Sequence, residues 1–423
     1  MRIHLIGIGG IGVSALAQYY LSKGHEVSGS DLGRSEITDF VKEKGVKVFI
    51  GNFAKNINKD LDLVVYSPAV KENNKELKQV KKFKIKTISY PEALGELTKE
   101  YYTIAVAGAH GKSTTTAMLG LALEKAGLDP TVIVGTKVKE FGNSNFRAGK
   151  SKLLVIEACE YDSSFLFYSP KIIVVTNIDK EHLDYFKTFE RVKKAFEKFI
   201  KKLPANGHLV QNMSLENPDA LKIKKVLQIP GRHNVLNALA VLQVTRILEI
   251  PDEITFEALS EFKGTWRRFE IKPGKADDKK ITVVSDYAHH PTEIYATLQA
   301  AREKYKQDKI WCVFQPHQHQ RTYYLFKDFV KILRQAQDDH FVDKIIVTDI
   351  YDVAGRETKK INKNTSSEKL VKKINKENVV YMRLDKIEKY LKENIGVGDL
   401  SRHEADVLII MGAGDIYKLA EKF

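Results

Sequence analysis

The chain has 423 residues, 43% of them hydrophobic, a length and composition that suit two or three domains with proper cores. Only two cysteines occur and no apolar run approaches the length of a membrane span, which excludes a disulfide framework and a transmembrane protein and predicts a cytoplasmic location. The net charge is +14, but the lysines are interleaved with acids, so we expect a solvated surface suited to anionic small substrates, with neither a nucleic-acid partner nor a membrane.

The first 31 residues predict a strand, a glycine-rich turn, a helix and a second strand. A short strand over Ile3–Ile8 is broken by glycines, which does not fit a signal peptide. Residues Gly7–Gly12 read Gly-x-Gly-x-x-Gly, and a helix over Val13–Lys23 follows. The second strand ends at Asp31, about where dinucleotide-binding units place the acid that binds a ribose. Other diphosphates bind such turns through the same helix N-terminus, so the motif alone leaves the ligand open.

The segment from Thr103 to Thr116 carries the clearest chemical signal. An apolar strand enters a glycine turn, and a helix-forming run leaves it. Gly108 and Gly111 let backbone N–H groups approach an anion, Lys112 would reach the terminal phosphates, and Ser113 would hold Mg²⁺. The spacing Gly-x-x-Gly-Lys-Ser is shorter than the full phosphate-loop signature. Its place directly after a buried-type strand nevertheless predicts binding of a nucleoside triphosphate.

The same βα pattern continues to about residue 267. Strands over Leu153–Ile156 and Ile172–Val175 end in segments rich in acids, the second with a histidine, and these should face the ligand crevice of a parallel sheet. A later helix carries two asparagines on one face. Residues Gly264–Glu270 and the charged run Lys275–Lys280 are interpreted as the next domain boundary.

A third α/β domain is expected beyond that boundary. The predicted strands are Ile281–Ser285, Ile310–Phe314, Lys344–Thr348, Val379–Met382 and Val407–Met411. Two of them end in polar clusters, at residues 286–293 and 315–322. The fold class is therefore α/β in three domains: residues 1–99, Rossmann-like; residues 100–267, P-loop-like; and residues 268–423, Rossmann-like.

These motifs, in this order, resemble those of the Mur ligases of peptidoglycan synthesis, and most closely the alanine-adding branch. The shared motifs cover nearly the whole chain and include Ile-Gly-Ile-Gly-Gly-Ile-Gly, Ser-Pro-Ala-Val, Ala-His-Gly-Lys-Ser, Glu-Ala-Cys-Glu-Tyr-Asp, His-Leu-Asp-Tyr-Phe, Gly-Arg-His-Asn-x-x-Asn-Ala, Arg-Arg-Phe-Glu, Asp-Tyr-Ala-His-His-Pro-Thr-Glu, Phe-Gln-Pro-His and Gly-Ala-Gly-Asp. The last three motifs distinguish the alanine-adding branch. The resemblance implies that the three domains bind, in order, a UDP-sugar, ATP and an amino acid.

The implied reaction is ATP-dependent ligation. The lactyl carboxylate of UDP-N-acetylmuramate would attack the γ-phosphate of ATP, and the amine of L-alanine would displace phosphate from the resulting acyl phosphate. The resemblance implies two Mg²⁺ sites, in which Mn²⁺ would substitute. We expect a monomer or a weak dimer.

The resemblance assigns roles to residues of all three domains. UDP-sugar contacts are expected from Gly9, Gly10, Ile11, Asp31, Ser67, Pro68 and Asn145. ATP contacts are expected from Gly108, Ala109, His110, Gly111, Lys112, Ser113, Thr114, Asn234, Asn237, Arg268 and Asp349. The amino acid is assigned to Tyr287, His289 and Arg321, and the metal to Ser113, Glu157 and His182. The expected catalytic residues are Lys112, Glu157, His182, His289 and Arg321.

The expected amino-acid site also follows from chemistry. Arg321 can offer a bidentate fork to a carboxylate, and a neutral His289 could assist the attacking amine, whereas His290 is expected to cap the helix that begins at Pro291. Gln318 replaces an arginine that many alanine-adding relatives carry, which leaves less charge in this site. Two other positions depart from relatives: Cys159 replaces a common Asp, and Glu197, where sibling ligases carry a carbamylated lysine, is expected to be an exposed acid.

Three alternatives stay open at this point. Within the family, the chain could add another amino acid or recycle murein peptide. A nicotinamide-dependent enzyme would use Gly7–Gly12 but would leave the phosphate loop without a role. A nucleotide-sensing binding module would need the catalytic residues to be inert.

Overall fold

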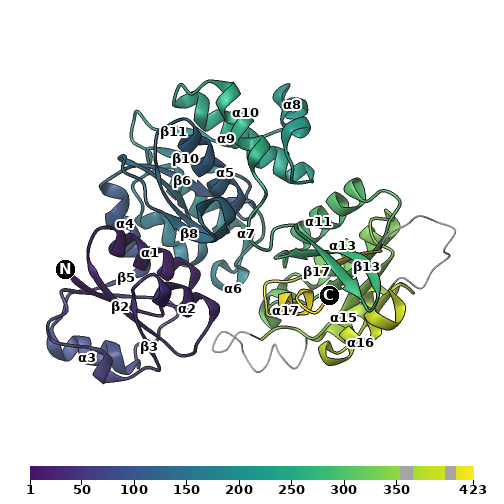
Figure 1. Cartoon of the computed structure of the whole chain (residues 1–423), viewed down its shortest axis with the longest axis horizontal. Helices are drawn as coiled ribbons and strands as arrows, with labels where there is room; N and C mark the ends of the chain where they lie inside the picture. Colours follow the sequence, from purple (N-terminus) through teal and green to yellow (C-terminus); the bar gives the residue numbers. More distant parts are fainter. Residues whose placement is uncertain (353–364, 396–405) are drawn as a thin grey trace. The chain divides into compact units, whose positions relative to one another are not determined.

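The computed structural model describes residues 1–352, 365–395 and 406–423, and three mainly parallel sheets organise them (Figure 1). Grouped by which residues lie close together, the chain divides into two compact units. The first contains residues 1–179, 193–226 and 237–262, and the second contains residues 180–192, 227–236 and 263–423. Within the described ranges, none of the helices combines the length and the apolar character that crossing a bilayer requires.

The first sheet has five parallel strands in the order β3-β2-β1-β4-β5. Its elements are β1 (Arg2–Ile6), α1 (Ile11–Ser22), β2 (Glu26–Asp31), α2 (Glu36–Glu43), β3 (Lys47–Ile50), β4 (Leu63–Tyr66), α3 (Lys75–Phe83), β5 (Thr87–Ser89) and α4 (Tyr90–Lys99). Val64 and Val65 of β4 are fully buried, as the apolar run in that strand requires. The strand order reverses between β1 and β4, which is where Rossmann-type sheets bind ligands.

The second sheet has the order β11-β10-β6-β9-β7-β8, with β7 and β8 antiparallel at one edge. Its elements are β6 (Tyr102–Ala107), α5 (Lys112–Lys125), β7 (Thr131–Val138), β8 (Ser144–Arg147), β9 (Leu153–Glu157), β10 (Ile172–Val175), α6 (Leu183–Phe186), α7 (Phe189–Ile200), β11 (His208–Val210), α8 (Asp219–Val226), α9 (Arg232–Ile247) and α10 (Asp252–Glu261). The predicted strand Ile172–Val175 is confirmed residue for residue. Helix α5 begins at Lys112, directly after the glycine turn, and Glu197 of α7 is exposed as predicted.

The third sheet has the order β12-β13-β17-β14-β15-β16. Its elements are β12 (Glu270–Ala276), β13 (Lys279–Asp286), α11 (Pro291–Lys304), β14 (Lys309–Phe314), α12 (His319–Tyr324), α13 (Phe326–Asp338), β15 (Lys344–Val347), α15 (Ser367–Ile374), β16 (Val379–Tyr381), α16 (Leu384–Asn394), β17 (Asp406–Met411) and α17 (Tyr417–Ala420). Buried side chains on the two faces of this sheet form separate apolar clusters, one against α11 and α13 and the other against α16 and α17.

The charged run Lys275–Lys280, interpreted together with Gly264–Glu270 as the next domain boundary, lies inside the third sheet. These residues belong to the antiparallel hairpin of β12 and β13, in which Lys275 pairs with Lys280 and Ala276 with Lys279. The turn is at Asp277, whose φ is +51°, and Asp278. The lysines of this run lie at the exposed tip of the hairpin and resemble a linker in the sequence, whereas the predicted strand Ile281–Ser285 lies within β13 and carries buried apolar residues.

Candidate active site

The phosphate loop connects β6 to α5 in the first unit. Gly108 and Gly111 have φ of +141° and +83°, values that L side chains rarely adopt. A Cβ atom at Gly111 would lie 2.3 Å from the Asn237 Oδ1 atom. The first backbone N–H groups of α5 therefore follow a turn that only glycine fits, as an anion site at a helix N-terminus requires.

Residues in the segment that follows β10 also hold the phosphate loop in place. The Ala109 N–H donates to the Asn177 carbonyl at 3.1 Å, and the His110 N–H donates to the Asn177 Oδ1 atom at 2.9 Å. The His110 imidazole lies 3.0 Å from the Asp179 carboxylate. His110 is thus held by its backbone and its ring, and Thr114 lies buried in the first turn of α5.

Lys112 is paired with a buried acid that the sequence reasoning did not select. Its Nζ atom lies 3.1 Å from the Glu160 Oε2 atom and donates to the Gly108 and Ala109 carbonyls at 2.5 and 3.1 Å. The Glu160 side chain is only 1% exposed. Burial alone would lower the pKa of Lys112, but the charge of Glu160 raises it above its ordinary value, so the ammonium is retained.

Ser113 and Glu157 are brought together as predicted for a metal site. The Ser113 hydroxyl donates to the Glu157 Oε2 atom at 2.9 Å, and the Gly135 N–H donates to the same oxygen at 2.8 Å. A hydroxyl and a carboxylate are hard oxygen donors of the kind Mg²⁺ prefers, so these two residues fit the implied ion. His182 belongs to the second unit, and its part in the same metal site stays a prediction.

Cys159, next to these residues, stays a thiol. Burial, with the charge of Glu160 beside it, raises the pKa of Cys159 to about 12. A protonated thiol is a poor ligand for Mg²⁺, which agrees with leaving Cys159 out of the metal set.

The glycine turn of the first sheet lies at the reversal of strand order. A Cβ atom at Gly7 would lie 2.9 Å from the Ser67 Cβ atom, so the turn after β1 touches the turn after β4. The Asp31 carboxylate accepts a hydrogen bond from the Gly9 N–H at 2.8 Å. The structure therefore brings Gly9, Asp31 and Ser67 to one end of the sheet. Gly10 and Ile11 lead into α1, and Pro68 is exposed.

Asn145 is engaged within the protein. It is 2% exposed, its Oδ1 atom accepts from Gln18 at 2.7 Å, and its Nδ2 atom donates to Ser14 at 2.9 Å and to the Ile11 carbonyl. These bonds join β8 to α1, just beyond the glycine turn. The contact predicted from Asn145 to the sugar stays a prediction, and its observed role is to hold that helix.

In the second unit, Asp286 ends β13 and organises the turn after it. Its two carboxylate oxygens accept from the Phe269 and Ala288 N–H groups, each at 2.7 Å. Burial raises the pKa of Asp286 to about 6. His290 caps α11 as predicted, since its side chain accepts from the Thr292 N–H.

His289 has the properties expected of a neutral imidazole. Burial lowers its pKa to about 4, so it is uncharged at neutral pH. Its Nδ1 atom lies 3.0 Å from the Tyr287 carbonyl, an arrangement that assigns the proton to Nδ1 and the lone pair to Nε2. The Tyr287 and His289 rings meet edge to face at 5.3 Å.

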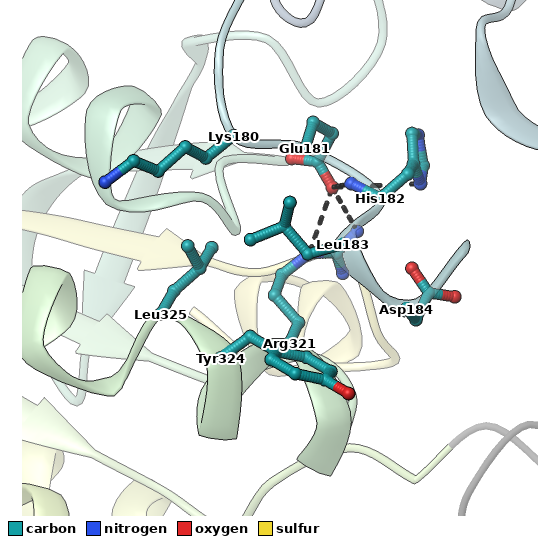
Figure 2. A pocket seen from close by; sticks show the side chains of 8 residues that line it. All are labelled: Lys180, Glu181, His182, Leu183, Asp184, Arg321, Tyr324 and Leu325. Atoms are coloured by element: carbon teal, nitrogen blue, oxygen red, sulfur yellow. Dashed lines mark hydrogen bonds and ion pairs between the residues drawn. The ribbon is translucent and has the colours of Figure 1, made fainter. Parts of the chain in front are cut away.

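Arg321 lies on α12 with each of its three guanidinium nitrogens engaged. Its Nη2 and Nε atoms donate to the Glu181 Oε1 atom at 2.8 and 3.2 Å, and its Nη1 atom lies 3.0 Å from the His317 Nδ1 atom. Both Glu181 and Arg321 line a small pocket in this unit (Figure 2). Gln318, which precedes α12, has φ of +69° and is 8% exposed.

The remaining predicted ATP residues are found on different elements. Asn234 and Asn237 lie three apart on α9, each 5% exposed, and Asn234 donates to the Pro230 carbonyl at 2.6 Å. The Arg268 guanidinium lies 4.9 Å from the centre of the Tyr287 ring. The Asp349 carboxylate accepts from the Tyr381 hydroxyl at 2.7 Å, which connects the segment after β15 to the end of β16. Contacts from these residues to ATP stay predictions.

Positive φ values at non-glycine residues, which the sequence does not reveal, occur in the loops near the phosphate loop and in those of the second unit. Of the fifteen non-glycine residues with positive φ among the described residues, six lie in these loops: Asp162, Ser163, His182, Arg267, Phe269 and Gln318. Strained backbone of this kind concentrates at ligand sites, because the surrounding structure must hold it there. Arg267, buried and 3.2 Å from the Gly414 carbonyl, was not selected from the sequence.

Comparison with known proteins finds three consecutive Mur ligase domains. Residues 2–102 match the Mur ligase family, catalytic domain; residues 106–228 match the Mur ligase middle domain; and residues 267–414 match the Mur ligase, glutamate ligase domain. The UDP-N-acetylmuramate–L-alanine ligases of Clostridium botulinum and Clostridium kluyveri are each 40% identical to this chain, with 100% of this chain and 97% of theirs covered. The solved UDP-N-acetylmuramate–alanine ligase of Thermotoga maritima is 29% identical, with a TM-score of 0.78 over 100% of this chain and 98% of that one.

Proposed function

We propose that this chain, which belongs to the Mur ligase family, joins L-alanine to the lactyl carboxylate of UDP-N-acetylmuramate with cleavage of ATP to ADP and phosphate. The observation that carries the proposal is 40% identity over the full chain to ligases named for this reaction. The paired residues of the phosphate loop and the neutral His289 support it independently. The product would be a precursor of peptidoglycan.

The first step would form an acyl phosphate. A lactyl carboxylate oxygen attacks the γ-phosphorus of ATP, the bond from that phosphorus to the β–γ bridging oxygen breaks, and ADP leaves. The Lys112 ammonium and the N–H groups that open α5 would neutralise charge on the transferring phosphoryl group. Ser113 and Glu157 would hold a Mg²⁺ ion, which supplies further positive charge when bound.

The second step would form the amide bond. The alanine nitrogen attacks the acyl carbon, the bond from that carbon to the phosphate oxygen breaks, and phosphate leaves. The nitrogen must lose a proton, and the neutral ring of His289 would orient the amine by offering its Nε2 lone pair as a hydrogen-bond acceptor. Arg321 would bind the alanine carboxylate through its planar fork.

We further propose that the chain works in the cytoplasm as a monomer or weak dimer, with Mg²⁺ at two sites that also accept Mn²⁺. The second ion would involve Glu157 and His182. An imidazole is a less usual ligand for Mg²⁺ and suits Mn²⁺ better, which is the reason to expect the substitution.

The proposal is tested by phosphate release and product mass with UDP-N-acetylmuramate, ATP, Mg²⁺ and a panel of amino acids. We expect turnover to require all three substrates and to be fastest with L-alanine, followed by serine and glycine. Preference for another amino acid or for a murein peptide would assign the chain to a different ligase. Tight NAD binding without ATP cleavage, or no phosphate release with any substrate, would overturn the ligase function.

A further inference from the structure

The segment Lys180–Asp184 lies against the domain of the third sheet in the second unit. Leu183 packs on the apolar cluster that α11, α13 and their strands form. This contact places the preceding Glu181 beside Arg321 of α12, 140 residues further along the chain. Figure 2 shows the Glu181 carboxylate facing the Arg321 guanidinium, joined to it by dashed lines.

The Glu181 carboxylate makes the contacts that a carboxylate ligand would make. One of its oxygens accepts from two nitrogens of Arg321, the Nη2 atom at 2.8 Å and the Nε atom at 3.2 Å. The third nitrogen faces His317. The two side chains are 6% and 10% exposed. An α-carboxylate that binds Arg321 through its fork therefore needs the donors that Glu181 occupies.

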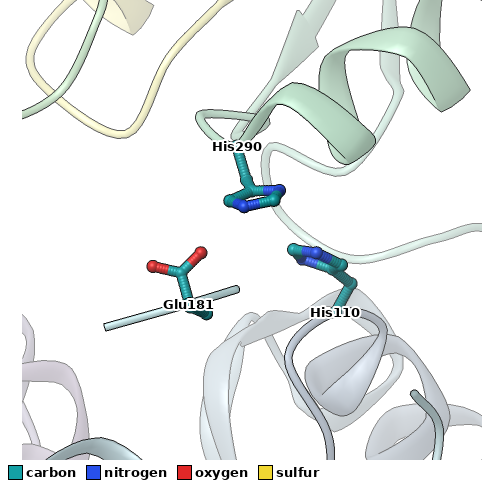
Figure 3. A group of neighbouring side chains, drawn as sticks. All are labelled: His110, Glu181 and His290. Carbon is teal, nitrogen blue, oxygen red and sulfur yellow. The ribbon is translucent and has the colours of Figure 1, made fainter. Parts of the chain in front are cut away.

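Glu181 faces Arg321 as a carboxylate, because the guanidinium, whose Nη2 atom lies 2.8 Å from the Glu181 Oε1 atom, favours the charged form of the acid. Figure 3 shows the Glu181 carboxylate and the His290 ring drawn close together in this region. A neutral acid would offer weak competition for a guanidinium, whereas a carboxylate matches the charge of an amino acid's α-carboxylate.

We propose that Glu181 competes with the amino acid for Arg321. Arg321 must release the Glu181 carboxylate and bind the substrate's α-carboxylate before the amine can attack. This inference rests on the proposed function, in which Arg321 binds the amino acid. Glu181 is then a residue that sets amino-acid affinity without contacting the reacting atoms. The same Glu181 Oε1 atom also accepts from the backbone N–H of His182 at 3.3 Å.

A different role for Glu181 makes the opposite prediction. If its carboxylate bound the α-ammonium of the amino acid while Arg321 bound the α-carboxylate, removing its charge would weaken amino-acid binding. The observed geometry favours competition, because the Glu181 oxygen that contacts Arg321 occupies two of its nitrogens.

The test compares Glu181→Gln with Asp184→Asn, which removes the same charge from the same segment where no bond to Arg321 exists. Kinetics would be measured by phosphate release. We expect Glu181→Gln to lower the KM for L-alanine about fivefold to tenfold, roughly the difference between a charged and a neutral hydrogen bond. The KM for ATP and the kinetics of Asp184→Asn should change less than about twofold, because Asp184, although half-buried in the same pocket, does not occupy the Arg321 donors that Glu181 occupies.

L-lactate separates the two roles, because it keeps the carboxylate of L-alanine and lacks the ammonium group. Competition predicts that Glu181→Gln strengthens inhibition by L-lactate in parallel with the fall in alanine KM. A raised or unchanged alanine KM, or unchanged inhibition by L-lactate, would overturn the inference.

Two further observations complete the test. Glu181→Asp keeps the charge but shortens the reach, and an intermediate fall in alanine KM is expected; this variant keeps the inference testable if Glu181→Gln does not fold. Wild-type protein that forms no product with L-alanine would refute the proposed function. An active wild type with no gain in Glu181→Gln would refute the competitor alone.

Discussion

Replacement of Lys112 tests both the chemistry of the phosphate loop and the cost of its buried ion pair. The side chains of Lys112 and Glu160 are 12% and 1% exposed, and their charged atoms lie 3.1 Å apart. Lys112→Ala therefore removes a cation from the phosphate site and also leaves a buried carboxylate without that partner. The phosphate role alone predicts a loss of turnover, and the buried ion pair adds a stability cost.

The two effects have different magnitudes. Breaking a buried pair by removing one partner costs about 3–5 kcal/mol of stability, a large part of the roughly 5–15 kcal/mol that holds a domain folded. Loss of a charge from the transferring phosphoryl group should raise the barrier by about 3 kcal/mol, on the order of a hundredfold in kcat. Lys112→Ala should therefore be both less stable and nearly inactive.

A double-mutant cycle separates the two effects. Urea unfolding and phosphate release would be measured for Lys112→Ala, Glu160→Gln and the double variant. The double variant should recover most of the lost stability, because the unpaired charge is gone, and should stay inactive. A double variant no more stable than Lys112→Ala would contradict the assigned pairing, and near-normal turnover of Lys112→Ala at saturating ATP would contradict the phosphate role.

Three further outcomes are expected. Gly111→Ala should raise the KM for ATP and lower the free energy of unfolding in urea by about 1–2 kcal/mol, because φ is +83° and the new Cβ would meet Asn237. An unchanged KM and an unchanged unfolding free energy would contradict the loop geometry. Glu157→Gln and His182→Ala should each need more Mg²⁺ for half-maximal turnover in a metal titration, and an unchanged requirement would remove that residue from the metal site. The protonated Asp286 side chain contributes stability that is full below pH 4 and is lost as pH rises through about 6. The free energy of unfolding of Asp286→Asn, relative to wild type, should therefore rise by on the order of 3 kcal/mol between pH 4 and 7. A difference in unfolding free energy that stays constant with pH would contradict the raised pKa.

The parts predicted correctly are those that short-range patterns determine. The strand Ile172–Val175 is a buried apolar run with a turn at its end, and the glycine turn before Lys112 is a local motif. In the hairpin, β13 was predicted from its apolar run, as the strand Ile281–Ser285, whereas β12 was missed because it lies at the sheet edge and is mostly exposed, so no apolar run marks it. Strand β8, at an edge of the second sheet, was missed because it has only four residues and a single apolar side chain among them.

The polar partners in the sites were not predictable, because the fold brings them together across long stretches of chain. Gln18 and Asn145 are separated by 127 residues, Lys112 and Glu160 by 48, and Glu181 and Arg321 by 140. Sequence patterns identify residue types suited to bind anions or metals. They do not show which of those residues the protein has already paired with another.

Burial explains why such pairs recur. A cation held in a water-poor site is costly unless a counter-charge accompanies it, so Lys112 and Arg321 each retain a carboxylate partner in the protein. Both are the cations assigned to anionic parts of substrates. Under the proposed roles, binding at each site would exchange one anion for another. Affinity would then depend on the difference between two charged contacts, and Glu160 and Glu181 would help to set how tightly the substrates bind.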